Sequence, residues 1–76
     1  MPPELRHVYS TMVNRIGYDA DAAELHVEFR NGRHAIYHEV PAEVARDVLS
    51  APSIGQALSG AIRGKFHFTY PERRHG

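Results

Sequence analysis

A strictly alternating segment in the first half of the chain constrains the fold more than any other feature. Leu25, Val27 and Phe29 are apolar, and the residues between them are polar or charged. Alternation with a period of two is typical of a β-strand that buries one face against a core. Asn31-Gly32 follows and favours a hairpin turn, because both residues tolerate a positive φ. The sequence therefore predicts an antiparallel hairpin at this point.

The length of the turn decides which side chains of the return strand, roughly residues 33–40, face the core. A two-residue turn would place two histidines on the apolar face. A three-residue turn with Gly32 in a bulge would instead place Ala35 and Tyr37 there. The second register separates apolar from polar side chains better and leaves only Ile36 on the polar side. We therefore predict that Tyr37 points inward.

Two short helices are expected after the hairpin. Pro41 suits the start of the first helix, and the apolar side chains of residues 44–49 recur with helical spacing. Pro52 ends this helix, and Ser53 is a typical N-cap for a second one over roughly residues 54–62. Both helices are therefore expected to lay an apolar stripe on the sheet.

The last part of the chain alternates again, with aromatic residues at Phe66, Phe68 and Tyr70. We expect Phe66 and Phe68 to fill the core, since a small domain needs large side chains there. The predicted fold class is α+β: an antiparallel β-meander of about three strands plus a possible C-terminal strand, packed by two short helices. We expect one domain over residues 8–70, a flexible lead-in over 1–7 and a flexible tail over 71–76.

Several function classes are disfavoured by the composition. A chain of 76 residues leaves little room for a deep catalytic pocket, and the absence of cysteine excludes thiolate zinc sites and cysteine nucleophiles. Residues 60–66 resemble a phosphate-binding loop but have the wrong spacing and lack its Ser or Thr. We expect no catalytic residues, no cofactor and no small-molecule substrate. Because the sequence shows no apolar run typical of a signal peptide or of a membrane-spanning helix, we expect a cytoplasmic protein with no membrane partner.

Six histidines raise the question of a metal site. In the preferred register His26, His34 and His38 share the polar face of the hairpin. His34 and His38 are four residues apart on one strand, about 13 Å, which is too far for both to bind one ion. Only His26 with His34 has reasonable geometry, and an exposed histidine-rich face is the simpler interpretation. We therefore predict no metal site.

Basic residues gather near the C-terminus although the whole chain has no net charge. From residue 61 onward the sequence contains four basic residues, Arg63, Lys65, Arg73 and Arg74, and a single acidic residue. Basic groups interleaved with aromatic rings are typical of surfaces that bind single-stranded nucleic acid. The candidate nucleic-acid-binding residues are accordingly these four together with Tyr70 and Tyr37.

Short elements in a fixed order across residues 8–68 carry a family resemblance. They are Ser10-Thr11, Ile16-Gly17-Tyr18-Asp19, Leu25, Val27, Phe29, Gly32, Tyr37, Val40-Pro41, Ala51-Pro52-Ser53, Gly55 and Ile62-Arg63-Gly64-Lys65-Phe66. In this order they resemble the KTSC domain, which occurs at the C-terminus of some lysyl-tRNA synthetases and as small stand-alone bacterial proteins. Four positions depart from the family pattern: Ala35 replaces a tyrosine, Ile54 stands where the family often has a lysine, and Ala57-Leu58 where it often has an aromatic pair.

The resemblance implies no established function, although RNA binding has been suggested for the family through the synthetase fusion. Two hypotheses of similar weight follow. One is a small non-enzymatic module that binds RNA through the basic and aromatic residues named above. The alternative is a protein-interaction or self-associating module, in which the aromatic C-terminal strand pairs across an exposed sheet edge.

Overall fold

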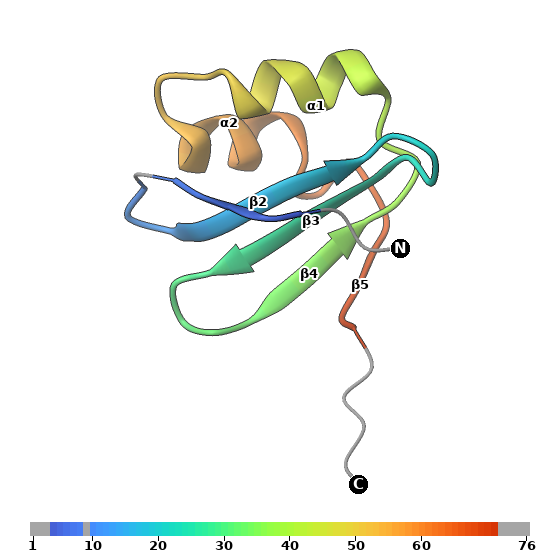
Figure 1. The fold of residues 1–76 in the computed structure, drawn as a ribbon. Helices are drawn as coiled ribbons and strands as arrows, with labels where there is room; N and C mark the ends of the chain where they lie inside the picture. The colour runs from blue at the N-terminus through green and yellow to red at the C-terminus, as the bar shows by residue number, and fades with distance from the viewer. Residues whose placement is uncertain (1–3, 9, 72–76) are drawn as a thin grey trace, which may run out of the picture.

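The described residues form one five-stranded antiparallel sheet with two helices on a single face (Figure 1). The computed structural model describes residues 4–8 and 10–71. Strands follow one another in the order β1-β2-β3-β4-β5, which is a meander. The prediction of an α+β meander with two helices is therefore confirmed. The elements are β1 Arg6–His7, β2 Val13–Asp19, β3 Glu24–Phe29, β4 His34–Tyr37, α1 Ala42–Leu49, α2 Ile54–Ala61 and β5 Phe68–Thr69.

The turn between β3 and β4 has the predicted register. Phe29 N–H donates to Arg33 O at 2.8 Å, and Gly32 N–H donates to Phe29 O at 3.0 Å. Gly32 has a φ of 93°, a left-handed conformation that glycine adopts without steric cost. As a result Leu25 pairs with Tyr37 across the two strands, and Val27 pairs with Ala35.

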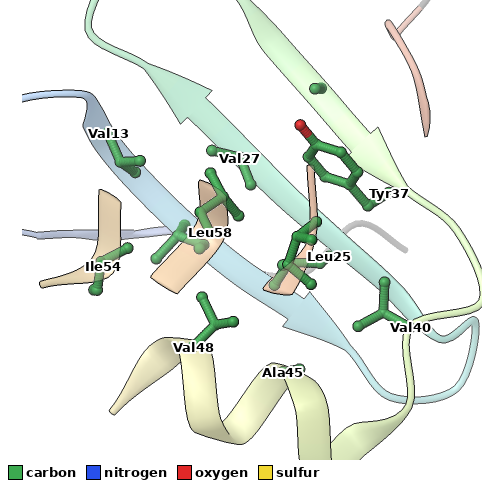
Figure 2. Packing of buried hydrophobic residues seen from close by; sticks show 12 residues of the cluster. Val13, Leu25, Val27, Tyr37, Val40, Ala45, Val48, Ile54 and Leu58 are labelled. Carbon is green, nitrogen blue, oxygen red and sulfur yellow. The ribbon is translucent and has the colours of Figure 1, made fainter. Parts of the chain in front are cut away.

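The core lies between the inner face of the sheet and the two helices, and Figure 2 shows its packing. Ser53 caps α2 as expected, since its hydroxyl accepts a hydrogen bond from Gln56 N–H. The helices contribute buried side chains with the predicted spacing, while Tyr37 lies at the edge of the cluster with its hydroxyl directed away from Val40 (Figure 2). The buried apolar residues are Val13, Ile16, Leu25, Val27, Ala35, Tyr37, Val40, Ala45, Val48, Ile54, Leu58 and Ile62.

The N-terminal segment crosses the outer face of the sheet, the face that the helices do not cover. β1 pairs with β2, placing Arg6 opposite Ile16. Just before it, Glu4 and Leu5 lie directly over Gly17: a Cβ added at Gly17 would lie 2.6 Å from the Glu4 carbonyl oxygen and 2.8 Å from Leu5 Cδ2. The ordered sheet thus begins before residue 8, the boundary expected from the sequence, because the missing side chain of Gly17 lets the chain approach closely.

The C-terminal part of the chain differs from the expectation at one aromatic residue. Phe66 packs against the core as predicted, but Phe68 is 43% exposed. The prediction that Phe68 fills the core is therefore wrong. Phe66 belongs to the turn that follows α2, so the alternation of a strand does not extend from it to Phe68. Strand β5 is only two residues long and pairs Phe68 with Tyr37.

Among the described residues no helix has both the length and the apolar character that crossing a bilayer requires.

Candidate nucleic-acid interface

A groove of about 780 Å³ opens between the β3–β4 turn, the turn after α2, and strand β5. The turn supplies Arg30 and Arg33, and the segment after α2 supplies Arg63. The lining also contains the aromatic side chains of Phe29, Tyr37, Phe68 and Tyr70, and within residues 4–8 and 10–71 it includes no acidic residue. The groove therefore combines cationic groups with aromatic rings on one surface.

Local backbone structure explains why the arginines reach this groove. The three-residue turn places Arg30 and Arg33 on either side of Gly32, at the end of the hairpin. Arg63 follows the last buried residue of the α2 region, and its N–H donates to Leu58 O at 2.9 Å. Gly64 then adopts a φ of 82°, which turns the chain toward β5. Segments far apart in sequence are thereby brought to one edge of the sheet.

Three aromatic rings contact one another in sequence along the groove. The centroids of Tyr37 and Phe68 lie 5.5 Å apart at an angle of 43°, and those of Phe68 and Tyr70 lie 5.5 Å apart at 83°. The first pair is tilted and the second is edge-to-face, and both centroid distances lie in the usual range for aromatic pairs. Tyr70 is 54% exposed, so Phe68 and Tyr70 leave ring surface available to a flat ligand.

Each of the three arginines is held by a neutral partner. Arg33 Nη1 donates to the Tyr70 hydroxyl at 3.3 Å, and its guanidinium carbon lies 5.7 Å from the Tyr70 ring centroid. Arg30 Nε donates to Ser10 O at 2.6 Å. Arg63 Nη1 lies 3.6 Å from Met12 Sδ. These contacts orient the guanidinium groups without cancelling their charge.

The ion pairs of the described residues lie elsewhere. Among the arginines of the described residues, only Arg15 forms an ion pair, and its partner is Glu28. The Arg15 guanidinium holds the pKa of the Glu28 carboxyl below its ordinary value through their hydrogen bond. The charge of the groove is therefore not balanced by a carboxylate among the described residues.

Three of the six residues predicted from the sequence come together here, namely Arg63, Tyr37 and Tyr70. Lys65 is exposed beside the groove but does not line it. Arg73 and Arg74 lie outside the described residues, so their part in the prediction stays open. The sequence reasoning missed Arg30, Arg33 and Phe68.

Tyr37 is the least accessible of the predicted residues that the structure describes. It is 4% exposed, and burial raises the pKa of its hydroxyl. The inward orientation expected from the hairpin register is confirmed. Tyr37 therefore forms the floor of the groove, and the open ring faces belong to Phe68 and Tyr70.

Charge is segregated between the two ends of strand β3. Its last residue is followed by Arg30 and Arg33, whereas its first residue, Glu24, adjoins the acidic β2–β3 turn at the opposite end of the sheet (Figure 1). Val40 N–H donates to Ala23 O at 2.9 Å, which brings the start of α1 to the same acidic end. The acidic residues at this end are Asp19, Asp21, Glu24, Glu39 and Glu43.

A second groove, of about 900 Å³, adjoins the first and runs along α2. It shares Thr11, Met12 and Arg30 with the first groove. Its remaining lining includes hydroxyl and amide side chains of α2, Gln56 and Ser59, and in the described part of the chain again no acidic residue. The two grooves therefore meet at Met12 and Arg30.

The histidine-rich face lies on the opposite side of the sheet from the helices. His26 Nε2 lies 3.0 Å from Glu24 Oε1, and the His26 and His34 rings meet edge-on with centroids 6.0 Å apart. His26 is only 6% exposed, because it pairs with Gly17, where the N-terminal segment crosses. Within residues 4–8 and 10–71 no three His, Asp or Glu side chains are placed to hold a metal ion.

Residues 9–66 match the KTSC domain family. The chain is 34% identical over 62 residues to a protein of Tsukamurella paurometabola, covering 82% of this chain and 92% of that one. It is also 34% identical over 58 residues to a lysine–tRNA ligase of Nostoc punctiforme, covering 76% of this chain but 10% of the ligase. An uncharacterized protein of Stutzerimonas stutzeri is 33% identical over 61 residues, which cover 80% of this chain and 84% of that protein.

The crystal structure of a KTSC domain protein from Yersinia pestis has the same fold, with a TM-score of 0.88 at 31% identity. The alignment covers 93% of this chain and 100% of that chain. These matches agree with the resemblance carried by the ordered sequence elements, and the chain belongs to the KTSC domain family.

Proposed function

We propose that this protein is a non-enzymatic RNA-binding module whose site is the arginine-lined aromatic groove. One observation supports the proposal above all others: Arg30, Arg33 and Arg63 converge with Phe68 and Tyr70 on one groove, and no described residue of its lining is acidic. Guanidinium groups pair with phosphate oxygens, and exposed rings stack on bases. Such a groove complements both parts of a nucleotide.

Electrostatics favour a phosphate ligand at this end of the molecule. The chain has no net charge, but five of its nine acidic residues lie at the far end of the sheet and no described acidic residue lines the groove, so the groove keeps a positive local potential. Potentials of this kind act over about one Debye length, roughly 8 Å at physiological salt. Binding that rests on phosphate contacts weakens steeply as salt rises, because bound counterions are released.

RNA is a better candidate than DNA on the basis of one relative. The Nostoc punctiforme protein is by its name a lysine–tRNA ligase, and it carries a region similar to this chain. A module attached to such an enzyme has tRNA as its nearest nucleic acid. This association supports RNA as the partner, and the groove chemistry supplies the physical reason.

The test is a backbone amide NMR titration with mixed tRNA at low and at physiological salt. We expect salt-sensitive shifts at residues 30–33 and 63–70. The double variant Arg33→Ala/Arg63→Ala should weaken binding and lower the salt slope by roughly 0.7 for each single-strand phosphate that the variant no longer neutralises. The charge-matched double variant Arg6→Ala/Arg46→Ala changes two exposed arginines outside the groove, and we expect it to bind nearly as the wild type.

Two outcomes would overturn the RNA proposal. One is the absence of shifts at low salt, where electrostatic binding is strongest. The other is an equal loss of affinity in both double variants, since a general loss of positive charge would then explain the binding without the groove.

Self-association is the second candidate, and the edge strand β5 favours it. Among the described strands β5 is the last of the sheet, and it pairs with β4 alone. Phe68 and Tyr70 are the exposed large apolar side chains of the described residues, and an open edge beside such residues is a template for pairing with another strand. Sedimentation equilibrium at high concentration tests this: a monomer throughout argues against it, and a dimer that persists at high salt supports it over RNA binding.

A further inference from the structure

We infer that the RNA bound by this protein is single-stranded and continues from the aromatic groove past Met12 into the second groove along α2. The inference rests on the proposed function and adds the class of RNA and the path of the strand. Its starting point is geometric: Thr11, Met12 and Arg30 line both grooves. A ligand that fills one groove therefore has an open route into the other.

The two grooves offer different chemical groups, and a single RNA strand can use both, one for its bases and the other for its backbone. The first contains the exposed rings of Phe68 and Tyr70. Among the described residues the second has no aromatic lining, and its accessible groups are hydroxyls and an amide: Thr11, Ser53, Gln56 and Ser59. Rings stack on bases, whereas hydroxyl and amide groups bond to sugars and phosphates. Bases are therefore assigned to the first groove and the continuing backbone to the second.

Arg30 lies where the two grooves meet, and hydrogen bonds hold it in place. Its backbone N–H donates to Met12 O at 2.9 Å, and its side-chain Nε donates to Ser10 O at 2.6 Å. No ion pair engages its guanidinium among the described residues. The two terminal nitrogens of the guanidinium can then contact the phosphate that joins the two segments of the strand.

Stacking on the rings of the first groove selects against a duplex. Bases inside an RNA helix are already stacked on one another, and side chains reach only their edges. The ring faces of Phe68 and Tyr70 gain a partner only when a base is unstacked. We therefore expect loops and unpaired ends of an RNA to bind, and continuous double helix to bind weakly.

The two glycines that line the second groove show where it can be blocked without disturbing the fold. A Cβ at Gly55 would lie 3.2 Å from Ser10 Oγ, so Gly55 is closely packed. A Cβ at Gly60 would meet nothing within 4 Å. Gly60 lies in α2, where any ordinary residue favours the helix more than glycine does. The variant Gly60→Gln thus fills the groove with a neutral side chain and preserves the helix.

The test compares diuridylate with octauridylate by NMR titration at low salt. The dinucleotide reaches only the aromatic groove, and the octanucleotide reaches both. We expect Gly60→Gln to weaken octauridylate about fivefold, the effect of losing one or two hydrogen bonds, and to leave diuridylate unchanged. The control Ala42→Gln places the same side chain on α1, outside both grooves, and should leave both affinities at the wild-type value.

The outcomes separate this inference from the function on which it rests. If Gly60→Gln binds octauridylate as the wild type does while Arg33→Ala loses it, the second groove is not used and the inference is wrong, although the RNA proposal stands. If a hairpin duplex binds as tightly as octauridylate, the assignment to single strands is overturned. If the wild type binds neither oligonucleotide, both the proposed function and the inference fail.

Discussion

The two faces of the sheet are built in different ways. The inner face carries Leu25, Val27 and Tyr37 against two helices that follow directly in the chain. The outer face carries histidines, and it is covered at Gly17 by a segment that comes from the N-terminus. The inner face is held by many apolar side chains, whereas the covered part of the outer face depends on the absence of a single side chain. Two buried surfaces of one sheet can therefore be stabilised in different ways.

The largest effect on stability is expected when one leucine on each face is shortened to alanine. Leu58 is fully buried between α2 and the sheet, so Leu58→Ala should lower the free energy of unfolding by about 2–5 kcal/mol. Leu5 is half-buried on the outer face, and Leu5→Ala should cost about 1 kcal/mol, because the three carbon groups that the substitution removes are only partly withdrawn from water. Chemical denaturation of both variants measures the difference. Equal losses would contradict the distinction between the faces.

A smaller effect is expected when the close approach on the outer face is blocked. Gly17→Ala places a Cβ 2.6 Å from the Glu4 carbonyl oxygen, and the displaced segment should cost about 1–3 kcal/mol, as overpacking usually does. Hydrogen exchange should increase first at Arg6 and His7, the residues of β1.

The matched control for this substitution is Gly60→Ala, where the added Cβ meets only open space. We expect its stability to equal or exceed that of the wild type, because alanine favours a helix. If the hydrogen-exchange protection of β1 is the same in Gly17→Ala as in the wild type, the position of the N-terminal segment does not depend on Gly17.

The smallest effect concerns the pH dependence of the outer face. Burial lowers the pKa of His34 below its ordinary value of 6.5, with a further contribution from His26, while Glu28 opposes the shift. His34 Nε2 is buried and has no hydrogen-bond partner among the described residues. The unfolded chain therefore takes up the proton first as the pH falls. The stability from neutral His34 is fully present above pH 6.5 and is lost as the pH falls through the lowered pKa.

The measurement is the melting temperature of the wild type and of His34→Gln between pH 8 and pH 5. We expect the difference between the two proteins to change over this interval, with the wild type losing more stability toward acid. Parallel curves would show that His34 does not titrate differently in the folded and unfolded states.

Local sequence patterns were sufficient to predict most of the inner face. The alternation around Val27 and the turn at Gly32 determine the hairpin register, and the cap at Ser53 marks the start of α2. β1 could not be predicted, because two residues have no periodicity and their approach to Gly17 joins distant parts of the chain. Phe68 was misassigned because a turn at Phe66 interrupts the apparent strand pattern.

The candidate site was predicted in part for a similar reason. Counting charges along residues 61–74 identifies Arg63 but gives no information on which distant residues join it. Arg33 reaches the groove only because the hairpin brings its turn beside Tyr70. A charge pattern in sequence thus identifies one contributor to a surface, and the sheet topology determines the others.

The separation of charge along β3 has a consequence for how a polyanion meets this protein. A neutral molecule with opposite charges at its two ends has an electric dipole moment, and its field decays faster with distance than that of a net charge. A phosphate chain is therefore not attracted from far away. Within about one Debye length, roughly 8–10 Å, the field exerts a torque that turns the basic edge toward the incoming strand. Orientation at close range, more than long-range attraction, would then set the rate at which encounters become productive.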